Sequence, residues 1–189
     1  GLDLTKGWIA LLSSWIPEEE AMQVFDTLSQ LYQEPHRSYH NFTHICQLLN
    51  TLEQVPHQPK NPEALKLAIW FHDAIYDPKR NDNEERSAQL AKQVLTPMLP
   101  EDSNLPALVY TLIMSTQKHK PLNYSYDCRL LIDLDLSILG SEPAQYQQYA
   151  QQIREEYKQY PSFIYKMGRK QQLHRLLDAT WIYQTPHFR

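Results

Sequence analysis

Residues 65–76 read Leu-Lys-Leu-Ala-Ile-Trp-Phe-His-Asp-Ala-Ile-Tyr, and apolar side chains recur along them at helical spacing. The face that they define contains Leu65, Ala68, Ile69, His72 and Tyr76. A stripe with this period is typical of an amphipathic helix that packs against a core. The pattern therefore predicts a helix over residues 62–76, with His72 on its buried face.

Further stretches of the same kind lie on both sides of this one. Ile45, Leu48 and Leu52 repeat at helical spacing, with His44 beside them. Most of the thirteen prolines fall between such stretches, where proline begins or follows a helix. Helices are predicted near residues 4–14, 18–33, 41–54, 62–76, 82–95, 102–116, 126–139, 142–159 and 161–184, the last broken near Gly168.

Residues 132–138 alternate between apolar and polar side chains, a period that also fits a strand. No convincing partner strand occurs elsewhere in the sequence, and an isolated strand leaves its backbone groups unpaired. A helix is therefore the better interpretation. With no repeat and no long linker, the chain is predicted to be a single all-α domain over residues 1–189, a helical bundle.

Composition excludes several classes of protein. The 189 residues carry a formal net charge of -4 and show no basic stripe, so a nucleic-acid polymer is not an expected partner. No apolar run approaches the roughly 20 residues that span a bilayer, so no membrane association is expected. The two cysteines form no CxxC pair, and a cytoplasmic location with free thiols is the expectation. The abundance of tyrosine is compatible with a homodimer.

Only four glycines occur, at positions 1, 7, 140 and 168. A phosphate-binding P-loop and a GxGxxG dinucleotide turn each need several glycines close together, so both are excluded. No GxSxG nucleophile motif is present either. Any chemistry must therefore be built from side chains.

Histidine and aspartate provide the strongest chemical signal. His40 and His44 are four residues apart and face the same side of a helix, and the pair His72-Asp73 follows. Imidazole nitrogen and carboxylate oxygen are ligands suited to zinc, manganese, iron or nickel. One more carboxylate from a later helix would complete a metal site.

Asp133 and Asp135 are the candidates for that carboxylate. Asp135 shares a helical face with Leu131, Leu134 and Ile138, whereas Asp133 lies on a more mixed face. A carboxylate on an apolar face is costly unless it meets a cation. The pattern favours Asp135 and leaves Asp133 as the alternative.

The order His44, His72-Asp73, Asp135 resembles the H…HD…D signature of the HD superfamily, which are helical metal-dependent phosphohydrolases. Residues 37–44, 71–77, 83–88 and 133–140 are similar to a bacterial group of predicted HD phosphohydrolases, and the likeness runs from about residue 30 to the end of the chain. The resemblance implies a divalent ion (Mn, Ni, Co, Fe, Zn or Mg) held between central helices by His44, His72, Asp73 and Asp135. It also implies hydrolysis of a phosphomonoester or phosphodiester, with a small-molecule phosphate ester such as a nucleotide as substrate.

Further roles follow from the same resemblance. The string Tyr39-His-Asn-x-x-His44 is similar to the cyclic nucleotide phosphodiesterases, where the first histidine protonates the leaving oxygen. His40 and Asp73 are thus the predicted catalytic residues, and Arg37 and His119 the predicted substrate-binding ones. His119 is alternatively a ligand of a second metal. Weaker candidates are Lys118 or Lys120 for phosphate contacts, and Asp77, Glu84 and Glu85 for orienting a water or a ligand histidine.

Two other functions stay open from the sequence. Some HD-fold proteins are di-iron oxygenases, and others are ligand sensors that hold a metal without hydrolysis. Tyr146, Tyr149 and Tyr157 recur at helical spacing and are predicted to lie in the core or an interface. Arg154 and Arg169 resemble recurrent features of the same bacterial group, and ordinary ion pairs are favoured over substrate binding for both.

Overall fold

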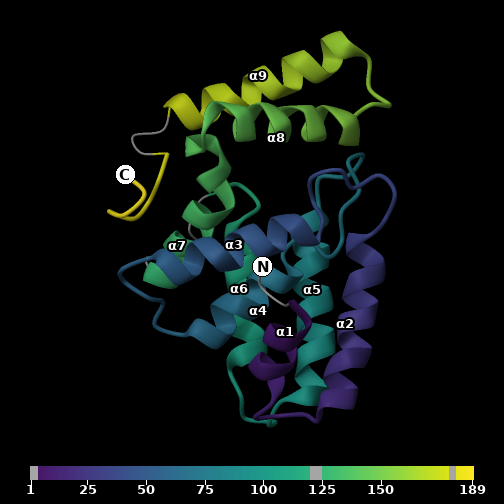
Figure 1. The fold of residues 1–189 in the computed structure, drawn as a ribbon, viewed down its shortest axis with the longest axis vertical. Helices are drawn as coiled ribbons and strands as arrows, with labels where there is room; N and C mark the ends of the chain where they lie inside the picture. Colours follow the sequence, from purple (N-terminus) through teal and green to yellow (C-terminus); the bar gives the residue numbers. More distant parts are fainter. Residues whose placement is uncertain (1–3, 120–124, 179–181) are drawn as a thin grey trace.

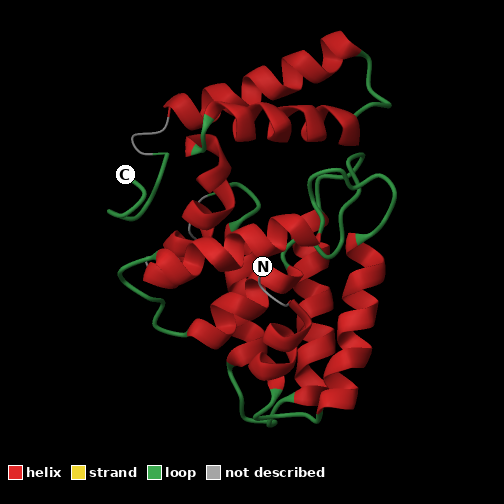
Figure 2. Ribbon diagram, viewed as in Figure 1, coloured by secondary structure: helices red, strands yellow, loops and turns green. Residues whose placement is uncertain are grey.

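The computed structural model describes residues 4–119, 125–178 and 182–189, and every regular element in these ranges is helical (Figure 2). The all-α prediction is therefore confirmed. In chain order the α-helices are α1 (Leu4–Leu12), α2 (Glu18–Tyr32), α3 (Phe42–Gln54), α4 (Pro62–Phe71), α5 (Asn83–Leu95), α6 (Leu105–Ser115), α7 (Tyr126–Leu136), α8 (Pro143–Glu156) and α9 (Ser162–Asp178). Short 3-10 helices follow α5 (η1, Thr96–Met98) and α7 (η2, Ser137–Gly140). Within the described ranges, no helix has both the length and the apolar character that a membrane span requires.

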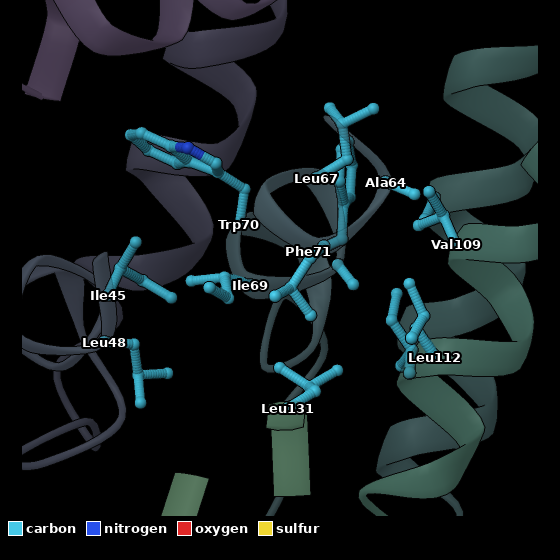
Figure 3. Packing of buried hydrophobic residues seen from close by; sticks show 14 of the residues in the cluster. Ile45, Leu48, Ala64, Leu67, Ile69, Trp70, Phe71, Val109, Leu112 and Leu131 are labelled. Atoms are coloured by element: carbon cyan, nitrogen blue, oxygen red, sulfur yellow. The ribbon is translucent and has the colours of Figure 1, made fainter. Parts of the chain in front are cut away.

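Helices α1 to α7 form a bundle with α4 at its centre. Every residue of α4 from Leu67 to Phe71 is buried, because this stretch is apolar on all sides and a helix of that kind must be enclosed. Figure 3 shows Ile45 and Leu48 on one side of the α4 side chains and Val109 and Leu112 on the other. The bundle thus holds the main hydrophobic core.

Helix α4 ends five residues earlier than the sequence predicted. Its start is capped by the Asn61 side chain, which accepts a hydrogen bond from the backbone of Ala64. Beyond Phe71, side chains from other segments satisfy the backbone: Arg37 donates to the carbonyls of the two residues after His72, and the Ser87 hydroxyl bonds both backbone groups of Ile75. The prediction of a helix to residue 76 is wrong because these distant partners replace the helical bonds.

The ambiguous stretch 132–138 is helical, as predicted. Helix α7 begins where the Ser125 hydroxyl accepts from the backbone of Cys128, and η2 continues the chain after Leu136. Hydrogen bonds within the helix pair the backbone groups that an isolated strand would leave open. Helix α7 thereby carries both candidate aspartates into the bundle.

Helices α8 and α9 form an antiparallel hairpin that lies across the top of the bundle in Figure 1 and is joined to it through η2. Helix α9 passes through Gly168 without interruption, so the predicted break there is wrong, and the helix ends at Asp178 instead of 184. A glycine costs a helix only about 1 kcal/mol relative to alanine, which neighbouring turns can offset. The hairpin supplies a second wall above the bundle.

Candidate metal centre

Four side chains from three helices meet beneath the hairpin. His44 comes from the first turn of α3, His72 and Asp73 from the turn that directly follows α4, and Asp135 from the last turn of α7. One ligand atom of each lies within 4.8 Å of those of the other three. The structure therefore brings together residues that lie up to 91 positions apart in the sequence, and this group can hold a metal ion.

The atoms that face one another in this group are hydrogen-bond acceptors. His72 Nδ1 lies 2.7 Å from the carbonyl oxygen of Ile69, and because a carbonyl only accepts, this nitrogen must carry the proton. In the neutral imidazole, which is the form that binds a metal, Nε2 is then a bare lone pair, 3.0 Å from Asp73 Oδ2 and 3.4 Å from Asp135 Oδ1. His44 Nε2 lies 3.4 Å and 3.3 Å from the same two oxygens.

Three of these buried atoms, His44 Nε2, His72 Nε2 and Asp73 Oδ2, have no hydrogen-bond partner. Leaving buried polar atoms unpaired is costly, and a cation between them satisfies all three at once. Two imidazole nitrogens with two carboxylates form a donor set that suits zinc and the later first-row divalent ions. The residues present therefore fit a divalent metal ion.

Both carboxylates of the group are held in their charged form. Burial raises the pKa of the Asp73 carboxyl, but the attraction of His72 and His40 outweighs burial and lowers it below its ordinary value. Burial likewise raises the pKa of Asp135, and the surrounding imidazoles of His119, His44 and His72 lower it further than burial raises it. A metal ligand must be deprotonated, and these two are at neutral pH.

The structure distinguishes the two aspartates of α7. Asp135 faces the cluster, whereas Asp133 is fully buried on another side of the helix. There its carboxylate accepts hydrogen bonds from the backbone of Gln184 and Thr185, each 2.7 Å long, and from the Thr185 hydroxyl. Asp133 thus holds the C-terminal segment against α7, and Asp135 is the one positioned as a ligand.

His40 lies beside the cluster and is oriented by a residue that the sequence did not single out. Its Nδ1 is 2.7 Å from Oε1 of Glu156, at the end of α8, and its ring stacks on Tyr76 with centroids 4.2 Å apart. Glu156 is only 2% exposed and also accepts from the backbone of Tyr39 and His40. Burial lowers the pKa of His40, but Asp73 and Glu156 outweigh it and raise the pKa above the ordinary value.

Glu156 lies 116 positions from His40 in the chain, which hid the pairing from local sequence patterns. A weak signal did exist: Tyr149, Ile153 and Glu156 follow at helical spacing, so Glu156 is on the buried face of α8 while Glu155 is exposed. A carboxylate on that face needs a buried partner.

His119 joins the site from the chain after α6. Its Nε2 lies 3.0 Å from Asp135 Oδ2, so it contacts the ligand carboxylate from outside the four-residue group. Its backbone has a φ of 51°, in the left-handed region that side chains other than glycine rarely adopt. Unfavourable backbone geometry of this kind is common at functional sites.

Arg37 does not lie where a substrate contact was expected. It is buried, and its guanidinium donates to the carbonyls of Asp73 (2.6 Å), Ala74 (2.7 Å) and His40 (3.2 Å), and pairs with Glu34. All of these bonds are to the protein itself. Arg37 therefore fixes the turn that carries His72 and Asp73, and it is absent from the lining of the neighbouring cavity.

The weaker candidates for substrate or water contacts also differ in whether they line the cavity. Glu84 lines the cavity, and burial raises the pKa of its carboxyl. Asp77 accepts from the backbone of Lys79 in a turn, and Glu85 and Lys118 are exposed away from the cavity. Lys120 lies outside the described residues. Of the members of this group that the structure describes, Glu84 is the one that lines the cavity.

A cavity of about 560 Å³ lies between the cluster and the hairpin. This volume is in the range of small-molecule binding sites. His40, Asp73, His119 and Asp135 form one part of its wall. Tyrosines form much of the remainder, namely Tyr39, Tyr76, Tyr149, Tyr157, Tyr160 and Tyr165. Tyr149 and Tyr157, expected in a core or interface, therefore also face this space.

No protein-family model matches the chain, and no curated protein or solved structure matches it either. The residues and geometry of this site are therefore the basis on which its function is inferred.

Proposed function

We propose that the chain is a metal-dependent phosphohydrolase of the HD superfamily, which cleaves a phosphomonoester or phosphodiester of a small molecule such as a nucleotide. The observation that carries the proposal is the group of four converging ligand atoms, with buried acceptors left unpaired, on the wall of a cavity of ligand size. The order of His44, His72-Asp73 and Asp135 along the chain supports the superfamily.

A divalent ion held by these four residues would supply positive charge for the phosphoryl oxygens and would acidify a water molecule for attack. His40 acts as the general acid that protonates the departing oxygen. Its Nδ1 is occupied by Glu156, which leaves Nε2 for the substrate, and its raised pKa keeps a proton available near neutral pH. Glu84, on the cavity wall with a raised pKa, is placed to orient the attacking water.

The test is a hydrolysis assay with purified protein loaded separately with manganese, cobalt, nickel or zinc, across a panel of phosphate esters. We expect turnover with at least one ion. Replacing the general acid, His40→Ala, should lower kcat by about 100-fold or more. The matched control is His57→Ala, which removes an exposed histidine that is not part of the cavity wall and should leave kcat unchanged.

Two outcomes would favour the alternatives. Metal binding with no turnover across the panel, but with stabilisation by a small molecule, would support a ligand sensor. Two irons per chain together with oxygen consumption would support a di-iron oxygenase. Within the described ranges, one group of histidines and carboxylates has metal-site geometry.

A further inference from the structure

Arg154 and Arg169 of the hairpin have different surroundings, and neither forms the ion pair that the sequence favoured. Arg154 donates to the carbonyls of Tyr157 (2.9 Å) and Tyr160 (3.2 Å), beyond the end of α8. This arginine therefore satisfies backbone groups where the helix ends, which is a structural role. Arg169 instead donates to two side chains and lines the cavity.

The guanidinium of Arg169 is held in place by neutral oxygen atoms. It donates to the Tyr149 hydroxyl at 2.9 Å and to Gln172 Oε1 at 2.8 Å, and it lies over the Tyr149 ring. In the part of the chain that the structure describes, no carboxylate pairs with it. The side chain is thus oriented while its charge is uncompensated.

Tyr149 does not neutralise this charge either. Burial raises the pKa of the Tyr149 hydroxyl, and although Arg169 acts in the opposite direction, the pKa stays above its ordinary value. The hydroxyl is therefore protonated and neutral at physiological pH. A partly buried guanidinium with only neutral partners is a binding point for an anion.

The other arginines on the cavity wall differ from Arg169. Arg80 makes a two-pronged ion pair with Asp82, both bonds being 2.8 Å, so its charge is already matched. Arg175 is exposed to solvent, where a charge attracts an anion only weakly. Among the described arginines and lysines of this wall, Arg169 alone combines partial burial with the absence of a counter-ion.

Aromatic rings connect Arg169 to the candidate metal centre. The Tyr149 ring beneath it contacts the Tyr39 ring, and the Tyr39 ring contacts that of His44, with centroids 4.7 Å apart in both pairs. Arg169 therefore lies on the wall of the same cavity as the cluster, with two tyrosine rings between it and the nearest ligand histidine.

We propose that Arg169, oriented by Tyr149 and Gln172, binds a second anionic group of the substrate while the scissile ester is at the His/Asp cluster. The substrate class is thereby narrowed to phosphate esters that carry a further phosphate or carboxylate. The identification of the substrate as a phosphate ester rests on the proposed function. The presence of an anion site at Arg169 does not depend on it.

The anion site is tested without turnover, by titrating inorganic phosphate into the metal-free protein in a calorimeter. Wild type should bind at millimolar concentrations, and Arg169→Gln should bind at least about tenfold more weakly, since bonds to a charged group are lost. The control Lys170→Gln removes one positive charge from an exposed position of the same helix, outside the cavity lining, and should bind as wild type. Absence of binding by wild type, or equal binding by Arg169→Gln, would overturn the assignment.

A kinetic experiment tests the second-group assignment. Two esters that differ only by a terminal phosphate are compared: Arg169→Gln should raise KM about tenfold for the longer ester and leave KM for the shorter one and kcat for both unchanged. Equal KM effects on the two esters would contradict a second-group role. If Arg169→Gln misfolds by circular dichroism, Tyr149→Phe serves instead, because it keeps the ring and removes the hydroxyl that orients the guanidinium. If no ester is hydrolysed, the proposed function fails, and the calorimetric result still decides the anion site.

Discussion

The α1–α7 bundle and the α8–α9 hairpin enclose the same cavity but are built in different ways. Helix α4 in the bundle is buried on every side, whereas α9 leaves large apolar side chains in solvent, including Phe163 (66% exposed) and Leu177 (69% exposed). The hairpin packs on the bundle through a small cluster around Tyr39, Tyr149 and Ile153, and through Glu156. The main hydrophobic core and the candidate metal ligands thus belong to the bundle, and the hairpin contributes groups that line the cavity.

This contrast predicts where the protein opens. Regions with few buried apolar contacts unfold locally at lower free energy than the core. A hairpin held by a thin tyrosine layer and one buried carboxylate should therefore separate from the bundle before the bundle unfolds. Such a movement would give a small molecule access to the cavity without disturbing the ligand residues.

The largest expected effect is the difference in unfolding free energy between a truncated side chain in the bundle and one in the hairpin. Phe71→Ala, in the fully buried end of α4, should lower the free energy of unfolding by about 3–5 kcal/mol, because it leaves a cavity in a close-packed core. Phe163→Ala on α9 removes the same ring from solvent and should change it by less than about 0.5 kcal/mol. Urea unfolding of both variants checks this, and similar losses would remove the distinction between the regions.

Metal removal should affect the bundle next most strongly. At an ion concentration 100 times its Kd, chelation should cost about 2.7 kcal/mol of unfolding free energy. In hydrogen-exchange measurements, the loss of protection should appear in α3, α4 and α7, which carry the ligands, and should spare α9. Protection lost only in α8 and α9 would place the ion elsewhere.

The pH dependence of the metal-free protein gives a further test of the cluster. Burial lowers the pKa of His72, but Asp73 and Asp135 raise it well above its ordinary value, so its stabilising effect is complete below about pH 6.5 and is lost as the pH rises through the raised pKa. The lowered pKa values of Asp73 and Asp135 stabilise above about pH 4 and lose this effect in acid.

The metal-free protein should therefore be most stable between these limits, and the stabilisation by metal should grow as the pH rises, since protons compete for the imidazoles. Thermal unfolding from pH 5 to 8, with and without chelator, measures both trends. A metal-free protein that becomes steadily more stable above pH 7 would contradict the arrangement.

A smaller effect concerns the joint between the two regions. Glu156→Gln should weaken the hydrogen bonds to His40 and Tyr39 and cost about 1–3 kcal/mol, chiefly as faster hydrogen exchange in α8. It should also lower kcat through the misoriented His40. Glu155→Gln is the matched control, because Glu155 is exposed and pairs with Lys158 at the surface. Equal effects of the two changes would show that Glu156 does not join the regions.

Helical periodicity was enough to predict which histidine and aspartate side chains of the bundle face the site. The apolar faces around His44 and His72 fix which way those side chains point, and the apolar neighbours of Asp135 distinguish it from Asp133. These inferences depend on residues within one or two turns, a range over which helix geometry is regular. The strand-like stretch 132–138 was correctly predicted to be a helix on a different ground, because no partner strand occurs in the sequence.

Contacts between distant segments are what the sequence did not reveal. The end of α4 depends on Arg37 and Ser87, the orientation of His40 depends on Glu156, and the surroundings of Arg169 depend on Tyr149. Each of these contacts is set by tertiary packing, and the helix propensity of neighbouring residues does not predict it. The continuity of α9 through Gly168 similarly reflects the turns on both sides.

The most direct test of the account is the metal content of protein purified without chelators, measured by element for wild type, Asp135→Asn and Asp133→Asn. Each variant removes one carboxylate charge from α7. Asp135 faces the cluster, whereas Asp133 binds the backbone of the C-terminal segment. We expect one divalent ion per wild-type chain, retained in Asp133→Asn and lost in Asp135→Asn. A metal-free wild type, or an Asp135→Asn variant that keeps its ion, would contradict the metal centre.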